Sequence, residues 1–240
     1  MSHRLYAQRA TWQNKPALRA VYEHLYARMA LACKPGRTLE IGGGSGNFGD
    51  FSAGVITTDI QQVPWLDAVC DAHQLPFVKE AFDNIVMFDV LHHLDRPRRF
   101  FSEAARALRT GGRIVMIEPM ITPVSWPIYQ YLHPEPVRLH EDPLEDGDPK
   151  SKTDPFDSNQ AIPMLLFRRG GESLIREFPT LRLREVHYLG LWAYPLSGGF
   201  RKWTLIPKAL VRSVLWLEDK VAPVLGPIFA FRLMAVVEKR

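Results

Sequence analysis

Short apolar runs alternate with helical patterns along most of the chain. Apolar residues recur at helical spacing behind Pro16, which predicts an amphipathic helix over residues 16–32. The segments that follow and read as strands are "TLEI", "VITTDI", "AVC", "NIVMFDV" and "RIVMIEP", with a clear helical pattern in "RPRRFFSEAARAL". Alternation of this kind predicts a parallel sheet wrapped by helices.

The second half of the chain is less regular. Residues 119–160 carry many prolines and acids with little periodicity, apart from a short helix predicted near "SWPIYQYL". A loop of this length inside a compact domain is usually a lid or a binding element. The remaining patterns predict helices at "GGESLIREFP" and "KALVRSVLWLEDKV" and strands at "TLRLREVHYLG" and "FAFRLMAVVEK".

Length and composition fit one large globular domain, since the chain has 240 residues of which 46% are hydrophobic. The nearly uncharged stretch 221–231 is too short to span a bilayer and contains two prolines. The N-terminus is polar and has no secretory h-region. Cys33 and Cys70 lie far apart without metal-like spacing, so we expect reduced thiols and a cytoplasmic protein.

The charge is modest in sum but unevenly distributed. The formal net charge is +4, the stretch 135–157 is acidic, and the chain from Arg201 onward is basic. A nucleic-acid enzyme would favour basic surface along its substrate path, so the acidic stretch argues against a nucleic-acid partner.

Glycines crowd the end of the first predicted strand in "TLEIGGGSGNFGDF". In an open α/β sheet this strand-to-helix turn is the usual cofactor site, because glycines let a ligand approach the backbone. Gly44, Gly46 and Gly49 fit the dinucleotide pattern G-x-G-x-x-G, so a nicotinamide-dependent oxidoreductase has to be considered.

Glu40 favours a different cofactor. A dinucleotide would bring a pyrophosphate to this turn, and a fixed carboxylate beside it would repel that group. S-adenosylmethionine carries a sulfonium and an ammonium and no phosphate. The pattern E-x-G-x-G-x-G, formed by Glu40, Gly42, Gly44 and Gly46, therefore suits it electrostatically.

These stretches resemble the class I, Rossmann-like S-adenosylmethionine-dependent methyltransferases, closely over residues 36–120 and in outline beyond. "LEIGGGSG" resembles the first family motif, and "VITTDI", "DAHQLPF", "FDNIVMFDVLHHL" and "ALRTGGRIVMIEP" resemble the motifs that follow. The resemblance implies that Asp59 binds the ribose hydroxyls with Ile60 beside the adenine. It also implies that Asp71 binds the adenine amino group with Ala72 alongside.

The resemblance implies a three-layer α/β fold with a mostly parallel seven-stranded sheet ending in an antiparallel strand. Gly46 and Asp59 lie close in sequence, which predicts an unusually short first helix for this family.

Residues for the methyl-transfer step are less clearly marked. Methyl transfer can proceed largely by positioning, but a hydroxyl or ammonium acceptor benefits from a base. His92 and His93 follow the fourth strand, and Asp89 is expected near the methionine end of the cofactor. We choose His133 as the first candidate base, with His92 and His93 as alternatives.

The stretch "YLHPEPVRLHEDPLEDGDP" contains further candidates. His133, Glu135, His140, Glu141 and Asp142 could supply a base with its carboxylate, or nitrogen and oxygen ligands for a metal. A solvated acidic loop is the favoured interpretation for most of this stretch, and we predict no metal site.

Residues 200–226 combine tryptophans and aliphatic residues with arginines and lysines. An interfacial amphipathic segment has this composition, which suggests peripheral contact with the inner face of a membrane and a lipid-like acceptor. A helix packed on the core, or a dimer face, would look similar and is the favoured alternative. No pattern predicts an oligomeric state.

We therefore predict a single methyltransferase domain over residues 1–240, with its core at about 36–120 and 171–240. Residues 119–170 and 190–226 are expected to cover the acceptor side. The predicted function is methyl transfer from S-adenosylmethionine to a small-molecule or lipid-like acceptor. The alternatives are an NAD(P)-dependent oxidoreductase and a non-catalytic S-adenosylmethionine-binding protein.

Overall fold

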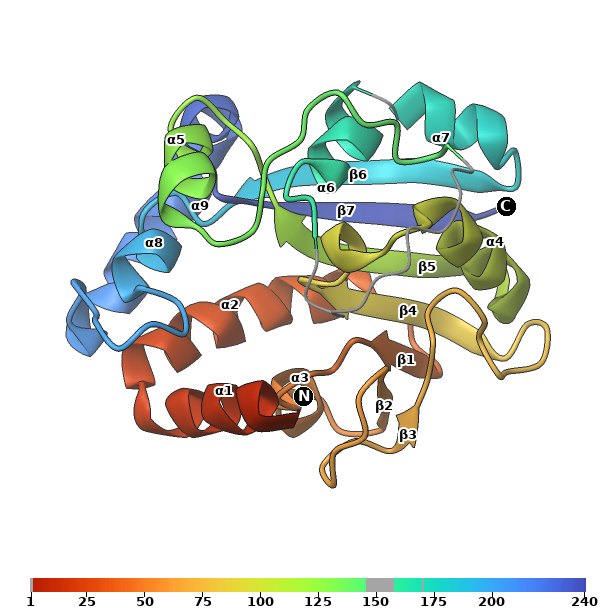
Figure 1. Cartoon of the computed structure of the whole chain (residues 1–240), viewed down its shortest axis with the longest axis horizontal. Helices are drawn as coiled ribbons and strands as arrows, with labels where there is room; N and C mark the ends of the chain where they lie inside the picture. Colours follow the sequence, from red (N-terminus) through yellow and green to blue (C-terminus); the bar gives the residue numbers. More distant parts are fainter. Residues whose placement is uncertain (1, 146–157, 170) are drawn as a thin grey trace.

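The computed structural model describes residues 2–145, 158–169 and 171–240 (Figure 1). In this part of the chain, the centre is a seven-stranded sheet in the order β3-β2-β1-β4-β5-β7-β6. The strands are β1 (Thr38–Ile41), β2 (Val55–Asp59), β3 (Ala68–Val69), β4 (Phe82–Phe88), β5 (Leu108–Pro119), β6 (Leu181–Leu189) and β7 (Arg232–Lys239). β1 to β5 pair in parallel, and β7 runs antiparallel to β5 and β6. The predicted fold class is confirmed.

Helices cover both faces of this sheet. They are α1 (Ser2–Asn14), α2 (Pro16–Ala32), α3 (Asn47–Phe51), η1 (Leu91–His93), α4 (Pro97–Ala107), α5 (Ser125–Leu132), α6 (Ile162–Met164), η2 (Leu165–Arg169), α7 (Gly171–Glu177), α8 (Ala193–Ser197) and α9 (Lys208–Phe229). α2, α3 and α9 pack on one face, and α4, α6 and α7 pack on the other. The result is the expected three-layer arrangement.

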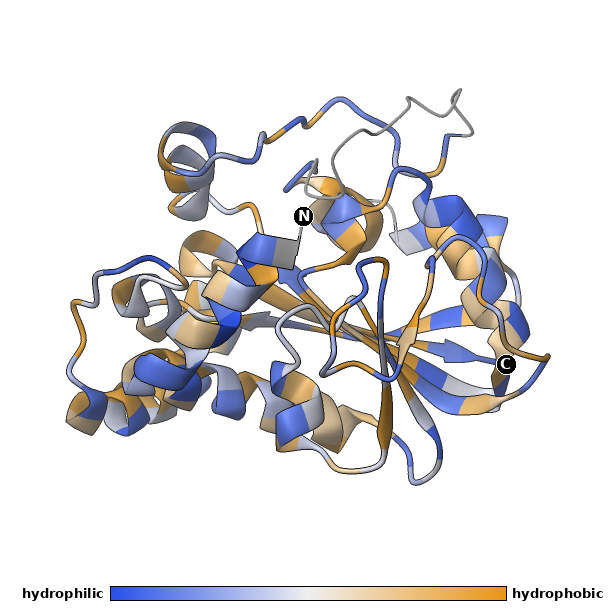
Figure 2. Cartoon of the chain, turned by 60° about the horizontal axis from the view of Figure 1, so that its bottom comes forward, coloured by the Kyte–Doolittle hydropathy of each residue, from blue (hydrophilic) through white to orange (hydrophobic). Residues whose placement is uncertain are grey.

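The core follows from the alternation of side chains along buried strands. In β5, Ile114 and Met116 join the cluster around α4, while Val115 and Ile117 join the cluster around α2. A strand covered on both faces has to be apolar on both, which explains the continuous hydrophobic run "IVMI". Figure 2 shows these hydrophobic central strands between helices whose outer faces are mixed or hydrophilic.

Most predicted elements are present within one or two residues of their expected ends. The first helix after the glycine turn, α3, is short as predicted. The pattern around residues 125–132 forms α5, and the pattern at 16–32 forms α2.

Two helices differ from the sequence expectation. The predicted helix 208–221 continues to Phe229 through Pro223 and Pro227. Each proline removes one backbone donor but has a helical φ, and the buried face of α9 remains packed through Gly226, which approaches Tyr188 of β6. α1 was not predicted, because its sequence has almost no amphipathic pattern. Two of its residues, Leu5 and Trp12, are nevertheless buried.

The parallel strands end toward α1, α5 and α8, which gather at one end of the molecule (Figure 1). These helices therefore stand at the carboxyl edge of the sheet, where open α/β folds bind ligands. Residues 146–157 and 170 of the predicted acceptor-side cover lie outside the described residues. That the whole chain forms one domain stays a prediction.

Candidate active site

A cleft of about 1250 Å³ opens at the carboxyl edge of the sheet. Its walls come from the glycine turn, the segments after β2, β3 and β4, and helices α1, α5 and α8 with the loop that follows α8. Pockets for one small ligand typically measure about 300–1,000 Å³. The cleft is therefore large enough for a cofactor and a second ligand.

At Gly42, the glycine turn lies so close to the segment after β4 that there is no room for a side chain. Gly42 has φ 72°, and a Cβ atom there would lie 2.2 Å from Cγ2 of Val90. Gly44 donates its N–H to Asp59 Oδ2 at 3.0 Å, which fixes the turn to the end of β2. Gly42 and Gly44 line the cleft, whereas Gly46 packs against Trp65 and Arg9 of α1.

Glu40 lies in the wall of the cleft beside this turn and is 4% exposed. Its Oε2 atom has no hydrogen-bond partner among the described residues. Burial, followed by the charges of Asp59, Asp50 and Asp67, raises the pKa of Glu40 to about 8. A buried carboxyl without a cationic partner is costly to ionise, so this wall is suited to a ligand that brings positive charge.

The residues predicted to hold the nucleoside also line the cleft. Asp59 is buried, and its Oδ1 accepts the N–H of Gln61 at 2.8 Å. These bonds leave further lone pairs on both carboxylate oxygens. Asp71 is half-exposed and accepts from His73, while Ala72 and the exposed Ile60 complete this end of the cleft.

Asp89 follows β4, lines the cleft and has a left-handed backbone with φ 59°. Its carboxylate pairs closely with the buried guanidinium of Arg232. That guanidinium also lies over the ring of Tyr194, 4.2 Å from its centroid, and 5.5 Å from that of Phe88. A non-glycine residue in this conformation is uncommon and typical of functional sites.

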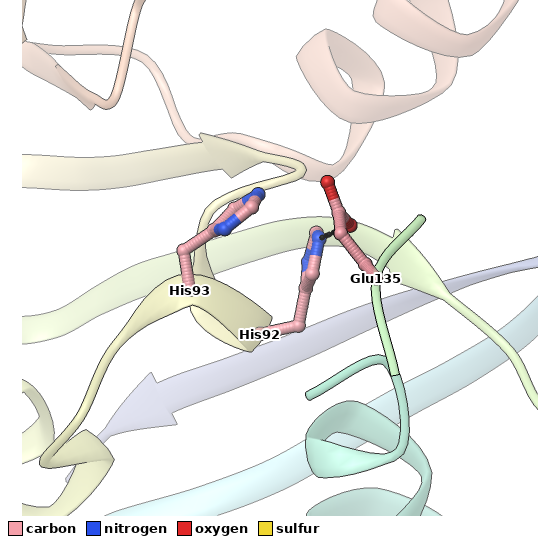
Figure 3. Close-up of side chains that lie close together, drawn as sticks. All are labelled: His92, His93 and Glu135. Carbon is pink, nitrogen blue, oxygen red and sulfur yellow. Dashed lines mark ion pairs between the residues drawn. The ribbon is translucent and has the colours of Figure 1, made fainter. Parts of the chain in front are cut away.

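His92, His93 and Glu135 meet on the opposite side of the cleft (Figure 3). The ring centroids of the two histidines are 4.2 Å apart. His92 Nδ1 lies 2.7 Å from Glu118 Oε2, and its Nε2 lies 3.5 Å from Glu135 Oε2. These are the contacts of a histidine ion-paired to two carboxylates. The ligand atoms of His92, His93 and Glu135 also lie within 4.8 Å of one another, so that the absence of a metal stays a prediction.

The pKa values of this group follow from that pairing. Burial by itself lowers the pKa of His92, but hydrogen bonds and charges of Glu118 and Glu135 outweigh it and raise the value to about 9. Burial raises the pKa of Glu135, but the hydrogen bond and charge of His92 outweigh it and lower the value to about 2. His92 is therefore an imidazolium and Glu135 a carboxylate near neutral pH.

His133, our first candidate base, follows α5 and also lines the cleft. Its Nδ1 accepts the backbone N–H of Glu135 at 3.3 Å, and burial lowers the pKa of His133. A neutral ring that accepts at Nδ1 carries its proton on Nε2. His140, Glu141 and Asp142 from the same stretch lie outside the cleft wall.

Several residues of the site did not stand out in the sequence. Glu118 was not recognised as a site residue, because a single acid near the end of a buried strand is an ordinary sequence feature. Glu135 was recognised as chemically able but was not chosen over His133. The others are Tyr129, Gln160, Tyr194 and Arg232, which come from elements far apart in sequence and meet through the fold.

Residues 39–116 match the family model of a methyltransferase domain. This region is a class I methyltransferase domain. The cofactor of the family is S-adenosylmethionine, which carries the cationic groups that suit Glu40.

Two curated relatives match a similar part of the chain. They are demethylmenaquinone methyltransferases from Clavibacter sepedonicus, 34% identical over 79 residues, and from Renibacterium salmoninarum, 30% identical over 70 residues. The matched segments cover 31% and 29% of this chain and 32% and 30% of the relatives. The chain thus matches about a third of the length of each relative.

Solved structures share the fold over most of the chain. A SAM-dependent methyltransferase from Thermotoga maritima superposes with a TM-score of 0.55 at 14% identity and covers 100% of both chains. A second SAM-dependent methyltransferase, from Archaeoglobus fulgidus, has a TM-score of 0.50 at 15% identity and covers 92% of this chain and 94% of its own. Both extend the methyltransferase fold beyond the region that the family model matches.

Replacing Gly42 with alanine separates backbone strain from crowding. Gly42→Ala and Gly54→Ala both put a side chain on a left-handed backbone, which costs about 1–2 kcal/mol, but position 54 has open space. Gly42→Ala should therefore lower the free energy of unfolding in urea by a further ~1–3 kcal/mol, because its Cβ meets Val90. Combining it with Val90→Ala should recover part of that difference. Equal effects of the two single variants would contradict the close approach.

The affinity for S-adenosylmethionine should depend on pH through Glu40. Below about pH 8 the carboxyl of the free protein holds a proton, and binding a cation favours its release. Affinity measured by calorimetry should therefore rise from about pH 6 to pH 8 and then level off. Glu40→Gln should bind more weakly and lose this part of the pH dependence, while the ligand's own titration remains. Identical pH profiles for the two proteins would count against contact with the cofactor.

Proposed function

We propose that the protein transfers the methyl group of S-adenosylmethionine to a small-molecule or lipid-like acceptor. One observation supports this proposal: a single cleft joins the carboxyl of Glu40, which has no partner in the described part of the chain, to a chamber lined with aromatic residues. Methyl transfer needs donor and acceptor in line and close together, and one continuous cleft allows that.

We infer the position of the donor from the family motif. Glu40, Gly42 and Gly44 would receive the methionine part, and Asp59 would accept the ribose hydroxyls. Asp71, with Ala72 and Ile60, would hold the adenine. The partial exposure of Ile60 leaves an apolar surface for a flat ring, and all of these residues line the cleft.

Aromatic side chains form much of the proposed acceptor chamber, beside the charged group of His92 and Glu135. Its lining includes Tyr22, Phe88, Tyr129, Tyr194, Phe200, Trp203 and Phe231. At the opening, Leu132 is 64% and Leu205 is 69% exposed, although both belong to the cleft wall. An apolar rim of this kind favours a hydrophobic acceptor. The name of the two curated relatives, demethylmenaquinone methyltransferase, also supports a small-molecule acceptor.

We further propose that residues 200–226 make peripheral contact with a membrane. Exposed Trp203, Leu205 and Trp216 lie in the same segment as exposed Lys202 and Arg212. This combination suits the boundary between anionic headgroups and acyl chains. Among the described residues, no helix is long and apolar enough to cross a membrane.

The function is tested by incubating the protein with isotopically labelled S-adenosylmethionine and a metabolite and lipid extract. Mass spectrometry should find a labelled product that requires the protein. Asp59→Asn should reduce its formation together with the affinity for the cofactor, because the ribose contact is weakened. Calorimetry should show binding of S-adenosylmethionine but not of a nicotinamide dinucleotide. Tight cofactor binding with no labelled product would instead favour a cofactor-binding protein without transfer activity.

Membrane contact is tested by flotation with phosphatidylcholine vesicles that contain or lack phosphatidylglycerol. The protein should float with the anionic vesicles, and less so at high salt, because the cationic contribution is screened. Leu205→Asp should reduce flotation, whereas Val78→Asp should not, since Val78 is similarly exposed at 77% but lies outside the segment. Protein that stays at the bottom of the gradient with both vesicle types would contradict this contact.

A further inference from the structure

Hydrogen bonds fix the position of Glu135 in the wall of the acceptor chamber. The segment that carries it is tied to residues 158–160 across the fold: Asn159 Oδ1 accepts the N–H of Arg138 at 2.9 Å, and Asn159 Nδ2 donates to Arg138 O at 2.9 Å. Gln160 donates its backbone N–H to Pro136 O at 3.0 Å, and its side-chain amide donates to Glu135 Oε2. The carboxylate is therefore held in place from several sides.

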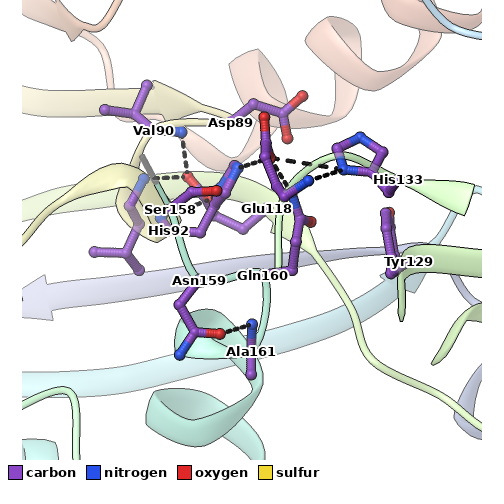
Figure 4. A network of polar contacts seen from close by, with 12 residues as sticks. Asp89, Val90, His92, Glu118, Tyr129, His133, Ser158, Asn159, Gln160 and Ala161 are labelled. Atoms are coloured by element: carbon purple, nitrogen blue, oxygen red, sulfur yellow. Dashed lines mark hydrogen bonds and ion pairs between the residues drawn. The ribbon is translucent and has the colours of Figure 1, made fainter. Parts of the chain in front are cut away.

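The partner of Glu135 is fixed in the same way. Glu118 is fully buried, and its Oε1 accepts the N–H groups of Val90 and Leu91 at 2.8 Å each. Its Oε2 binds His92 Nδ1 (Figure 4) and thereby sets the orientation of the ring, with Nε2 toward Glu135 (Figure 3). His92 O also accepts the N–H of Asn159 at 2.9 Å, which joins both segments into one network.

The charges around Glu135 select the kind of group that can approach it. The imidazolium of His92 lies on one side, and Arg4 Nη2 of α1 lies 3.6 Å from Glu135 Oε1 on the other. A cationic ammonium acceptor would be repelled by both. A neutral hydroxyl can donate a hydrogen bond to the carboxylate without that penalty.

We propose that Glu135 accepts the proton of an acceptor hydroxyl during methyl transfer, so that the acceptor is an alcohol or a phenol. This inference rests on the proposed methyltransferase function and names the acceptor class of the same cleft. His92 is the positioning residue, because it acts on the acceptor through Glu135.

The step balances without any further reactant. The hydroxyl oxygen forms a bond to the methyl carbon while the carbon–sulfur bond breaks and its electron pair stays on sulfur. The hydroxyl proton passes to a carboxylate oxygen of Glu135 and from there to solvent. The oxygen becomes strongly acidic only as the new bond forms, so a weak base that stays ionised is sufficient.

The low pKa of Glu135 favours a neutral hydroxyl over acceptors that must lose a proton before they attack the methyl group. An ammonium, or a phenol that must ionise before its ring carbon attacks, has a pKa of about 10 and would not give its proton to such a carboxylate in advance. His133 is less suited to the role, since its accepting nitrogen already binds the N–H of Glu135.

The test uses the full-length protein, labelled S-adenosylmethionine and a lipid and metabolite extract, with fragmentation to locate the methyl group. A methyl ether is expected. Glu135→Gln, which keeps the shape but not the base, should reduce product formation by about 100-fold or more, while the affinity for S-adenosylhomocysteine stays unchanged. Glu145→Gln, an exposed acid of the same loop, should behave as the wild type. Glu135→Asp keeps a carboxylate and should therefore retain part of the activity, which tests the role of the base even if the glutamine variant folds poorly.

His92→Asn provides a readout that a purely structural role would not give. Among the described residues, removing the imidazolium leaves Arg4, His93 and His133 as the groups whose positive charge acts on Glu135, with Tyr129 and Tyr194 as neutral titratable neighbours. The pKa of Glu135 should therefore rise. The acid limb of the pH–rate profile should then move to higher pH.

Transfer by Glu135→Gln within about threefold of the wild type, or a methyl group on nitrogen, carbon or sulfur, would overturn the inference while leaving the methyltransferase function intact. No labelled product from a wild-type protein that binds the donor would overturn the proposed function itself, and this inference with it.

Discussion

A side chain at position 42 would place its Cβ 2.2 Å from Cγ2 of Val90, so the bare backbone of the turn after β1 lies directly against a side chain of the segment after β4. This approach brings the two halves of the cleft together. On one side of the contact lies Glu40 with the cofactor turn. On the other, Val90 leads directly into η1, where His92 is held by Glu118. Gly42 is thus required by the close approach of Val90, in addition to any requirement that a ligand imposes on the turn.

The two ends of the cleft differ in how their charges are satisfied. At the glycine turn, the carboxyl of Glu40 is buried without a partner among the described residues, so the protein by itself favours the neutral form. At the opposite end, the carboxylates of Glu118 and Glu135 are paired within the fold with the imidazolium of His92 and the guanidinium of Arg4. In the proposed function, a cation from the cofactor completes the first arrangement. The second needs no added charge and leaves a carboxylate to receive a neutral donor.

The sequence predicted the parts of the site that are local. The glycine turn with Glu40 follows the first strand, and Asp59 ends the second. Each of these two patterns can be recognised within a few residues of sequence. The contacts that were missed join distant positions: Asp89 and Arg232 are 143 residues apart, and His92 and Glu118 are 26 apart. Their pairing depends on the order of the strands in the sheet. α9 extends beyond the predicted segment 208–221 to Phe229, and its packing on α2 and β6 carries the helix through two prolines.

α1 has little amphipathic pattern, but its arginine side chains contact both ends of the cleft. Arg9 Nη1 donates to Ser45 O at 2.5 Å and lies over the ring of Trp65, whose indole N–H in turn binds Gly44 O at 2.9 Å. Arg4, one to two turns earlier, faces Glu135 at 3.6 Å. A single helix therefore touches the cofactor turn and the acceptor-side carboxylate.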